Sequence, residues 1–409
     1  MDRRRFLSLS AAGMALPASP ASSAATDLAP PPGAPPPISR AEREARIAKA
    51  QRLMREQGVS ALLIEPGSSL VYFTGVRWSR SERLTCALIP ADGDICIVTP
   101  FFEEPSVRES LAAPAEVRTW QEHEDPTALV AGWLRDRKAD KVVAIEETNR
   151  FFIVDGLQRN LPGATLRNGA PIVRGCRMIK SPAEIALMQR AADITMAAYR
   201  HTVPRIEAGM RPSDIGAIMN GATVALGGRP EFALVLLGEA SAYPHGSGKP
   251  QIVKAGEVIL MDCGCTFEGY QSDVSRTFVH GEPTARQRMV WGQVKRGQEI
   301  AFEAASLGAT CGSVDDAARA HYVSLGYGPD YRLPGLSHRT GHGIGMDGHE
   351  PVNLVRGEGT RLAPGMCFSD EPGLYIPGEF GIRLEDCFHM TEAGPKWFSS
   401  PAVSIEKPV

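Results

Sequence analysis

Apolar residues in the first half of the chain occur at two kinds of spacing, which predict alternating helices and strands. Residues 40–57 carry apolar side chains at helical spacing, and Gly58 ends the predicted helix. Those side chains are Ile47, Ala50, Leu53 and Met54. Short continuous apolar runs, which predict buried strands, cover residues 61–64, 86–89, 95–98 and 142–145. With a further predicted helix over 126–137, the alternation indicates an α/β domain, which we expect to span residues 39–170.

The second half of the chain opens on a strong helix start. Ser181 can cap the helix, Pro182 fits its first position, and Glu184 completes a capping box. The residues on the predicted buried face of this helix are Ile185, Met188, Ala192, Met196 and Tyr199. Further helices are predicted over residues 286–307 and 313–325, with strands between and after them. We expect an α+β domain over residues 171–409, in which helices back a curved antiparallel sheet.

Two segments near the N-terminus have compositions unlike those of folded domains. Residues 1–25 combine adjacent arginines at positions 3–5, an apolar stretch and a small-residue end, which are the parts of an export signal. The arginine cluster predicts a twin-arginine-type signal, so we expect an exported, periplasmic protein. Residues 26–38 contain the sequence PPPGAPPP and predict a proline-rich linker, with order beginning near Ser39.

Bulk composition excludes several classes of partner. A hydrophobic content of 43% and a charged content of 22% are those of a soluble globular protein. No other stretch approaches the about 18 uninterrupted apolar residues of a membrane-spanning helix. The formal net charge of −3 leaves no basic excess for binding nucleic acid, so we expect small substrates. The 8 cysteines are sparse for a disulfide scaffold and predict small, buried apolar side chains.

Residues able to carry chemistry concentrate in the last third of the chain, beside short apolar runs or glycine-rich turns. Four carboxylates and one imidazole stand out there: Asp262, Asp273, His342, Glu371 and Glu385. Carboxylates packed together repel one another and take up protons unless cations neutralise them. Two divalent metal ions about 3.5–4 Å apart would neutralise these groups and share a nucleophilic water. We therefore predict a binuclear metallopeptidase. Oxygen-rich ligation with one imidazole suits Mn²⁺, and Co²⁺ or Zn²⁺ can substitute.

Local patterns predict how some of these side chains are placed. Asp262 ends an apolar run, and Asp273 lies 273 − 262 = 11 positions later, a length that fits a hairpin with both carboxylates on one face. Arg383 and Glu385 alternate on the same face of a predicted strand. The adjacent acids point the other way under the same pattern, so we exclude them from the site; they are Asp370 and Asp386.

These motifs resemble those of the pita-bread metallopeptidase family, which includes prolidase, aminopeptidase P and methionine aminopeptidase. The resemblance covers nearly all of the chain after the proline-rich segment. It implies a creatinase-like α/β N-terminal domain, an α+β pita-bread catalytic domain, and a homodimer that associates through the N-terminal domain. The stretches CRMIKSPAEIALMQ and GPDYRLPGLSHRTGHG are most similar to bacterial Xaa-Pro dipeptidases.

The resemblance implies a role for each matching metal ligand. Asp262 would hold one metal ion, and His342 with Glu371 would hold the other. Asp273 and Glu385 would bridge the two ions. Glu371 would also accept and shuttle the proton of the attacking water.

The resemblance further implies residues that act on the substrate. His245 would lie near the scissile group and His349 would stabilise the tetrahedral intermediate, although either could instead be structural. His338 would line the pocket for proline. Arg383 would bind the C-terminal carboxylate of a dipeptide as a charged fork, or would form an ion pair that supports Glu385.

Several functions compete on this fold. The leading prediction is hydrolysis of Xaa-Pro dipeptides, and the nearest alternative is an aminopeptidase P that trims longer Xaa-Pro peptides. A metal-free creatinase and a catalytically silent peptide-binding module also share the fold. Both of these lack the intact ligand set that this chain retains. Activity on substrates without a free carboxylate would separate the first two functions, and bound metal would argue against the silent module.

Overall fold

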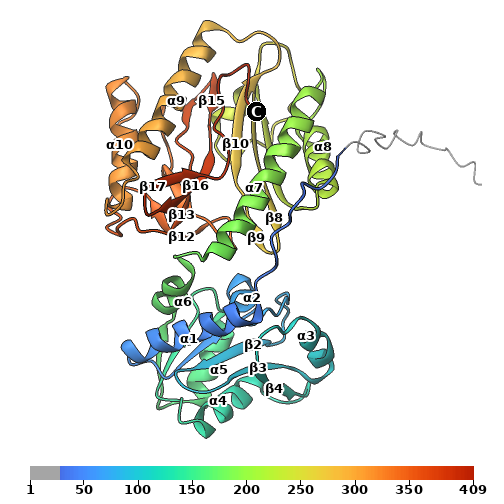
Figure 1. Ribbon diagram of the computed structural model, residues 1–409, viewed down its shortest axis with the longest axis vertical. Coiled ribbons are helices and arrows are strands. Elements are labelled where there is room, and N and C mark those ends of the chain that lie inside the picture. Colours follow the sequence, from blue (N-terminus) through green and yellow to red (C-terminus); the bar gives the residue numbers. More distant parts are fainter. Residues whose placement is uncertain (1–27) are drawn as a thin grey trace, which may run out of the picture.

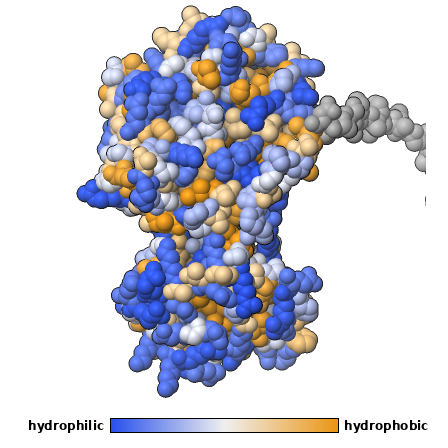
Figure 2. All heavy atoms as spheres, viewed as in Figure 1, coloured by the Kyte–Doolittle hydropathy of each residue, from blue (hydrophilic) through white to orange (hydrophobic). Residues whose placement is uncertain are grey.

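The structure is a computed structural model that describes residues 28–409. These residues form two domains, with the smaller N-terminal domain below the C-terminal domain in Figure 1 and a narrowing between them in Figure 2. The predicted export signal, residues 1–25, lies outside the described residues. None of the helices between residues 28 and 409 is long and apolar enough to cross a membrane.

The N-terminal domain is a three-layer α/β structure around a six-stranded sheet with the order β4-β3-β2-β1-β5-β6. Its strands are β1 (Ala61–Ile64), β2 (Cys86–Pro90), β3 (Ile95–Pro100), β4 (Ala115–Trp120), β5 (Val142–Ile145) and β6 (Thr165–Asn168). Its helices are α1 (Arg40–Glu56), α2 (Ser68–Thr74), α3 (Glu104–Ser110), α4 (Pro126–Asp136), α5 (Phe151–Asn160) and α6 (Ala170–Arg177). The strands predicted from the apolar runs are confirmed, as are the helices predicted over 40–57 and 126–137.

Burial on both faces of the sheet explains why its strands are continuously apolar. Alternate residues of a strand point to opposite faces. Leu62 and Ile64 pack in a cluster with residues of α1, α2 and α6, whereas Ala61 and Leu63 pack in another cluster with residues of α4 and α5. Because α6 packs against α1, the domain junction falls after α6, between Arg177 and the start of the next helix.

The C-terminal domain is an antiparallel sheet structure covered by long helices. Its helices are α7 (Pro182–Thr202), α8 (Pro212–Ala225), α9 (Ala285–Ala304) and α10 (Cys311–Ser324). Its longer strands are β7 (Arg229–Leu237), β8 (Val258–Phe267), β10 (Val274–Val279), β12 (Glu350–Leu354) and β16 (Asp386–Thr391). Its shorter strands are β9 (Tyr270–Gln271), β11 (Gly341–Gly343), β13 (Cys367–Asp370), β14 (Leu374–Ile376), β15 (Phe380–Ile382) and β17 (Gly394–Trp397). The start of α7 is as predicted, because Ser181 and Glu184 form a capping box.

Two half-sheets meet in the middle of this domain. The first has the strand order β10-β8-β7 and the second has the order β12-β11-β13-β16-β17. A bridge between Ser275 and Glu385 joins them at their centre. Apolar residues of α7 and α8 pack on the first half-sheet, and residues of α9 and α10 pack on the second (Figure 1). The predicted arrangement of helices backing an antiparallel sheet is therefore confirmed.

An ionic cluster, buried except at Asp347, links the two domains. Arg177, at the end of α6, donates to Glu350 and Asp347 of the C-terminal domain. Lys180 Nζ lies 3.0 Å from Glu350 Oε2, and Ser68 Oγ of α2 donates to Asp347 at 2.6 Å. Burial alone would raise the pKa of Glu350, but the two cations lower it to about 2. The carboxylate is therefore fully charged at neutral pH.

The proline-rich segment differs from the expectation that order begins near Ser39. Leu28 packs against the apolar cluster of α7 and α8, and Ile38 packs against the cluster shared by the two domains. In between, the Arg190 guanidinium donates to the carbonyls of Pro31 and Pro32. Consecutive prolines leave these carbonyls free of helix or sheet bonding, so an arginine can bind them. Residues 28–38 thus lie along the C-terminal domain down to α1 (Figure 1).

Candidate metal centre

The five predicted metal ligands come together from segments far apart in the sequence. Asp262 lies in β8, Asp273 directly precedes β10, and His342 lies in β11. Glu371 directly follows β13, and Glu385 directly precedes β16. All five line one cavity of about 680 Å³ between the half-sheets. The predicted hairpin of β8 and β10 is present, with Asp262 opposite Ser275, two residues beyond Asp273.

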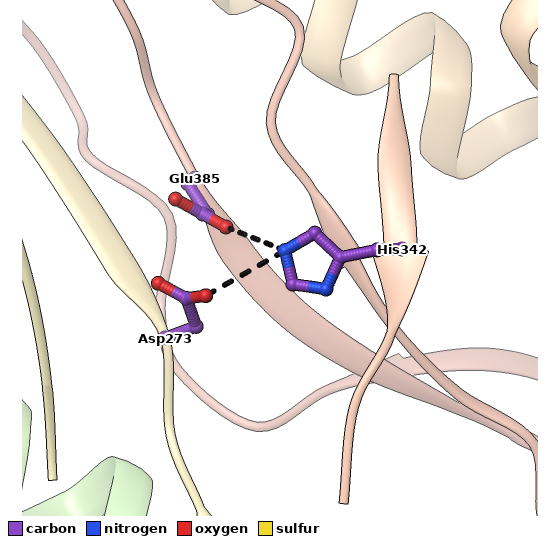
Figure 3. Close-up of side chains that lie close together, drawn as sticks. All are labelled: Asp273, His342 and Glu385. Atoms are coloured by element: carbon purple, nitrogen blue, oxygen red, sulfur yellow. Dashed lines mark ion pairs between the residues drawn. The ribbon is translucent and has the colours of Figure 1, made fainter. Parts of the chain in front are cut away.

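The imidazole of His342 faces three of the carboxylates, two of which, Asp273 and Glu385, are drawn in Figure 3. Its Nε2 lies 3.6 Å from Asp273 Oδ2, 3.4 Å from Glu371 Oε1 and 3.9 Å from Glu385 Oε1. Ligand atoms of Asp273, His342 and Glu385 all lie within 4.8 Å of one another. Such a group of buried nitrogen and oxygen donors could hold a divalent cation.

Unpaired oxygen atoms test whether a cation fits this site. Asp262 Oδ1, Asp273 Oδ1 and Glu385 Oε1 are buried and have no hydrogen-bond donor within the described part of the chain. Buried polar atoms are nearly always satisfied, so three orphaned acceptors in one cavity need a partner. Divalent cations satisfy all three and balance their charge, so the donor set fits a metal centre.

Backbone contacts fix the orientation of His342. Its Nδ1 lies 3.1 Å from the Gly343 carbonyl, which can only accept, so Nδ1 carries the proton and Nε2 presents a lone pair. Its backbone N–H donates to Ser369 Oγ at 3.0 Å. A Cβ at Gly341 would lie 2.0 Å from the Ser369 carbonyl, so a side chain there would push β11 away from β13.

Burial shifts the pKa values of the predicted ligands in the directions that favour their uncharged forms. It raises the pKa of Asp273 and of Glu385 well above the ordinary range, with added repulsion from neighbouring carboxylates. Burial, with Asp262 nearby, raises the pKa of Glu371 to about 7 even though Arg383 opposes the shift. Burial also lowers the pKa of His342 well below its usual value. Without cations, protons must neutralise this cluster.

We expect metal ions to stabilise the protein more as the pH rises from about 5 to about 8. A carboxyl whose pKa is raised on folding, such as Glu371, stabilises the metal-free protein below its unfolded pKa, and that stability is lost as the pH rises through the folded pKa of about 7. Metal-bound carboxylates do not take up those protons. The unfolding temperature with Mn²⁺ minus that with a chelator should therefore increase across this range, and a constant or falling difference would contradict the assignment.

Arg383 is held by the protein on every side. Its Nη2 donates to Asp262 Oδ2 at 2.6 Å, and its Nε donates to Ser275 Oγ at 3.0 Å. Its Nη1 donates to the Pro244 carbonyl and to Tyr375 Oη. Its ion pair is therefore with Asp262, and Ser275 Oγ links it to Glu385 by donating to Oε2 at 2.7 Å. The direct ion pair with Glu385 that the sequence suggested is replaced by this bridge.

The three predicted substrate-side histidines line the same cavity: His245, His338 and His349. His338 is fixed by its Nδ1 donating to the Arg339 carbonyl and by Tyr375 Oη, which lies 2.7 Å from its Nε2. Burial, with Arg383 nearby, lowers the pKa of His338 to about 3, so this ring is neutral. The ring of His349 lies 4.2 Å from that of His342, measured between centroids, and burial lowers its pKa.

Further cavity residues had not been singled out from the sequence: Glu231, Phe232, Leu234, Gln271, Tyr331, Arg339, Gly348 and Val355. Two of them had a visible signal, since Tyr331 and Arg339 both lie in the quoted stretch GPDYRLPGLSHRTGHG, and Arg339 stands beside His338. The excluded acids are placed as expected. Asp370 and Asp386 face each other across β13 and β16, outside the cavity, and Asp386 is paired with Arg276.

Comparison with known proteins identifies the class to which this fold and site belong. Residues 186–392 match the model of metallopeptidase family M24, and residues 46–179 match that of the creatinase/prolidase N-terminal domain. The chain belongs to metallopeptidase family M24. It is a metallopeptidase with a creatinase-type N-terminal domain, as the sequence predicted.

Individual relatives agree over most of the chain. It is 31% identical to an Xaa-Pro dipeptidase from Lactobacillus helveticus, over 86% of this chain and 95% of the relative. The crystal structure of dipeptidase PepE from Mycobacterium ulcerans superposes with a TM-score of 0.82 and 31% identity, over 89% of this chain and 97% of that one. An X-Pro aminopeptidase structure from Thermotoga maritima gives a TM-score of 0.74 and 28% identity, over 86% and 97%.

Proposed function

We propose that this protein hydrolyses the peptide bond before proline in Xaa-Pro dipeptides, with two divalent metal ions, Mn²⁺ by preference. The observation that carries the proposal is the single cavity in which five ligand side chains, three of them with unpaired buried oxygens, meet three histidines. Asp262, Asp273, His342, Glu371 and Glu385 would hold the ions. When bound, such ions would supply Lewis acidity and would lower the pKa of a bound water to about 7.

Other steps of the proposed reaction are assigned to side chains of the cavity. Glu371, with a pKa of about 7 before metal binds, accepts the proton of the attacking water and returns it to the proline nitrogen. His245 and His349 donate hydrogen bonds to the carbonyl oxygen as it becomes negative. His338, held by Tyr375, forms part of the wall against which the proline ring packs. The cavity is partly apolar there, since Phe232, Leu234 and Val355 also line it.

The second candidate is an aminopeptidase P that releases the first residue of longer Xaa-Pro peptides. Two observations favour it. All three guanidinium nitrogens of Arg383 donate to protein atoms, so this residue is not a free fork for the carboxylate of a dipeptide. The chain also resembles an X-Pro aminopeptidase structure at 28% identity.

Hydrolysis of Ala-Pro, Ala-Pro-Ala and Pro-Ala, each with Mn²⁺ and with a chelator, tests the two candidates. We expect metal-dependent release of alanine from Ala-Pro. Faster cleavage of Ala-Pro-Ala would establish the aminopeptidase instead. Pro-Ala is the matched control because it has the same atoms but no peptide bond before proline. Failure to cleave either Xaa-Pro substrate in the presence of bound metal would refute both proposals.

We also propose a homodimer and an exported location. Exposed aromatic side chains on the N-terminal domain support self-association, since Phe101 and Phe102 are each 56% exposed and Phe151 is 79% exposed. Light scattering should give twice the mass of one chain. The export proposal depends on residues 1–25, outside the described residues, and fractionation of cells should recover the protein from the periplasm. All 8 cysteines are free and buried, so the fold does not depend on disulfides formed after export.

A further inference from the structure

Arg339 is a second arginine on the wall of the cavity, and its guanidinium has no partner among the described residues. It is half-buried and lines the cavity together with His338 and His349. Unlike Arg383, its side chain makes no hydrogen bond or ion pair with any residue between 28 and 409. Its positive charge acts on the site, because it adds to the lowering of the pKa of His342 and of His349 by burial and opposes the rise in the pKa of Glu371.

The backbone that carries Arg339 is fixed on both sides. The Arg339 carbonyl accepts a hydrogen bond from His338 Nδ1 at 2.7 Å. The next residue, Thr340, donates from both its N–H and its hydroxyl to Asp315 Oδ1, at 3.0 and 2.7 Å. The base of the side chain is therefore rigid, while the guanidinium remains free to meet a ligand. Such an arrangement loses little side-chain freedom on binding a planar anion.

A half-buried guanidinium is partly removed from water, which costs free energy unless an anion pairs with it. Four of the five carboxylates that line the cavity are those that would hold metal ions, and one of them, Asp262, already pairs with Arg383. The fifth, Glu231, accepts a hydrogen bond from Thr266 Oγ1 at 3.0 Å. The ligand that completes Arg339 must therefore come from outside the chain. An arginine fork matches a carboxylate with two parallel hydrogen bonds.

We propose that Arg339 binds a free carboxylate of the peptide substrate and so determines substrate specificity. The inference rests on the proposed cleavage of Xaa-Pro peptides and names the residue that recognises them. That carboxylate is either the C-terminus of the proline or the side chain of an acidic first residue. Either source places the anion beside the wall formed by His338 and Arg339.

The test compares Arg339→Gln with Arg332→Gln in the metal-loaded protein. Arg332 is exposed, lies outside the cavity lining and carries the same charge, so it is a matched control. Steady-state kinetics would use Ala-Pro, Ala-Pro-amide and Asp-Pro. If the anion is the C-terminus, Arg339→Gln raises KM for Ala-Pro about 10- to 100-fold and leaves Ala-Pro-amide unchanged. If it is the acidic side chain, only Asp-Pro is affected. Both results support the proposal.

Other outcomes overturn it. Unchanged KM for all three substrates, or an equal loss on all three including the amide, would show that Arg339 does not bind a substrate carboxylate. Metal content and unfolding temperature should match those of the wild type, because the side chain has no partner to lose. Calorimetric binding of proline, prolinamide and aspartate to the metal-loaded protein gives the same comparison without turnover. Wild-type inactivity on every Xaa-Pro substrate would instead refute the proposed function, and the calorimetry would still decide the role of Arg339.

Discussion

Replacing Asp273 with asparagine is expected to remove bound metal and to lower hydrolysis of Ala-Pro more than about 100-fold. Loss of a group that only hydrogen-bonds a metal ligand already costs about 10–100-fold. Asp273 is itself a predicted metal ligand, so its loss should cost more. Its Oδ2 lies 3.6 Å from His342 Nε2, and its buried Oδ1 has no donor among residues 28–409. Asparagine keeps the shape of the side chain but removes the negative charge that neutralises a cation.

The matched control is the same substitution at Asp370. This carboxyl is also fully buried, and burial also raises its pKa well above the ordinary range, but it lies outside the cavity. Asp370→Asn should keep both metal and activity. Elemental analysis and initial rates on the purified proteins make the comparison. Equal metal content and equal activity in Asp273→Asn and the wild type would remove the basis for a metal centre at these residues.

Much of the architecture could be predicted because the local signals are strong. The capping box at Ser181 and the apolar runs of β1, β2, β3 and β5 each specify an element without reference to the rest of the chain. Short elements were missed where their signal is ambiguous. The helix α2, Ser68–Thr74, is a mostly buried apolar stretch of 7 residues that could equally be a strand by pattern. The packing of residues 28–38 depends on Arg190, a residue more than 150 positions away.

The site was predictable for a related reason and only in part. Each predicted ligand lies beside a short apolar run or a glycine-rich turn, so its local sequence marks it, and all of them line one cavity. Asp262 ends its apolar run, but it lies in the middle of β8 because the strand continues to Phe267. How these residues pair was not predictable. The link from Arg383 through Ser275 to Glu385 requires the two half-sheets to meet at the Ser275–Glu385 bridge, which joins residues 110 positions apart.

Behind the metal ligands, a second charged pair is buried without any solvent contact. Arg276 and Asp386 each have 0% exposed side chains, and Arg276 Nη2 lies 2.7 Å from Asp386 Oδ1. Arg276 Nη1 also donates to the Ser275 and Glu385 carbonyls, at 3.0 and 2.9 Å. The pair therefore holds together the two backbone segments that meet at the centre of the domain, one of which carries Glu385.

We expect Arg276→Met to lower the free energy of unfolding by about 3–5 kcal/mol, because it leaves the Asp386 carboxylate buried without its cation. The double variant Arg276→Met, Asp386→Leu should lose less than the sum of the single changes, since no charge remains uncompensated. Arg286→Met is the matched control. Arg286 pairs with Glu379 in a similar two-bonded geometry, but both side chains are more than 40% exposed, so its loss should cost at most about 1 kcal/mol. Urea unfolding of the metal-free variants gives the comparison, and equal losses for Arg276→Met and Arg286→Met would show that the buried pair does not hold the half-sheets together.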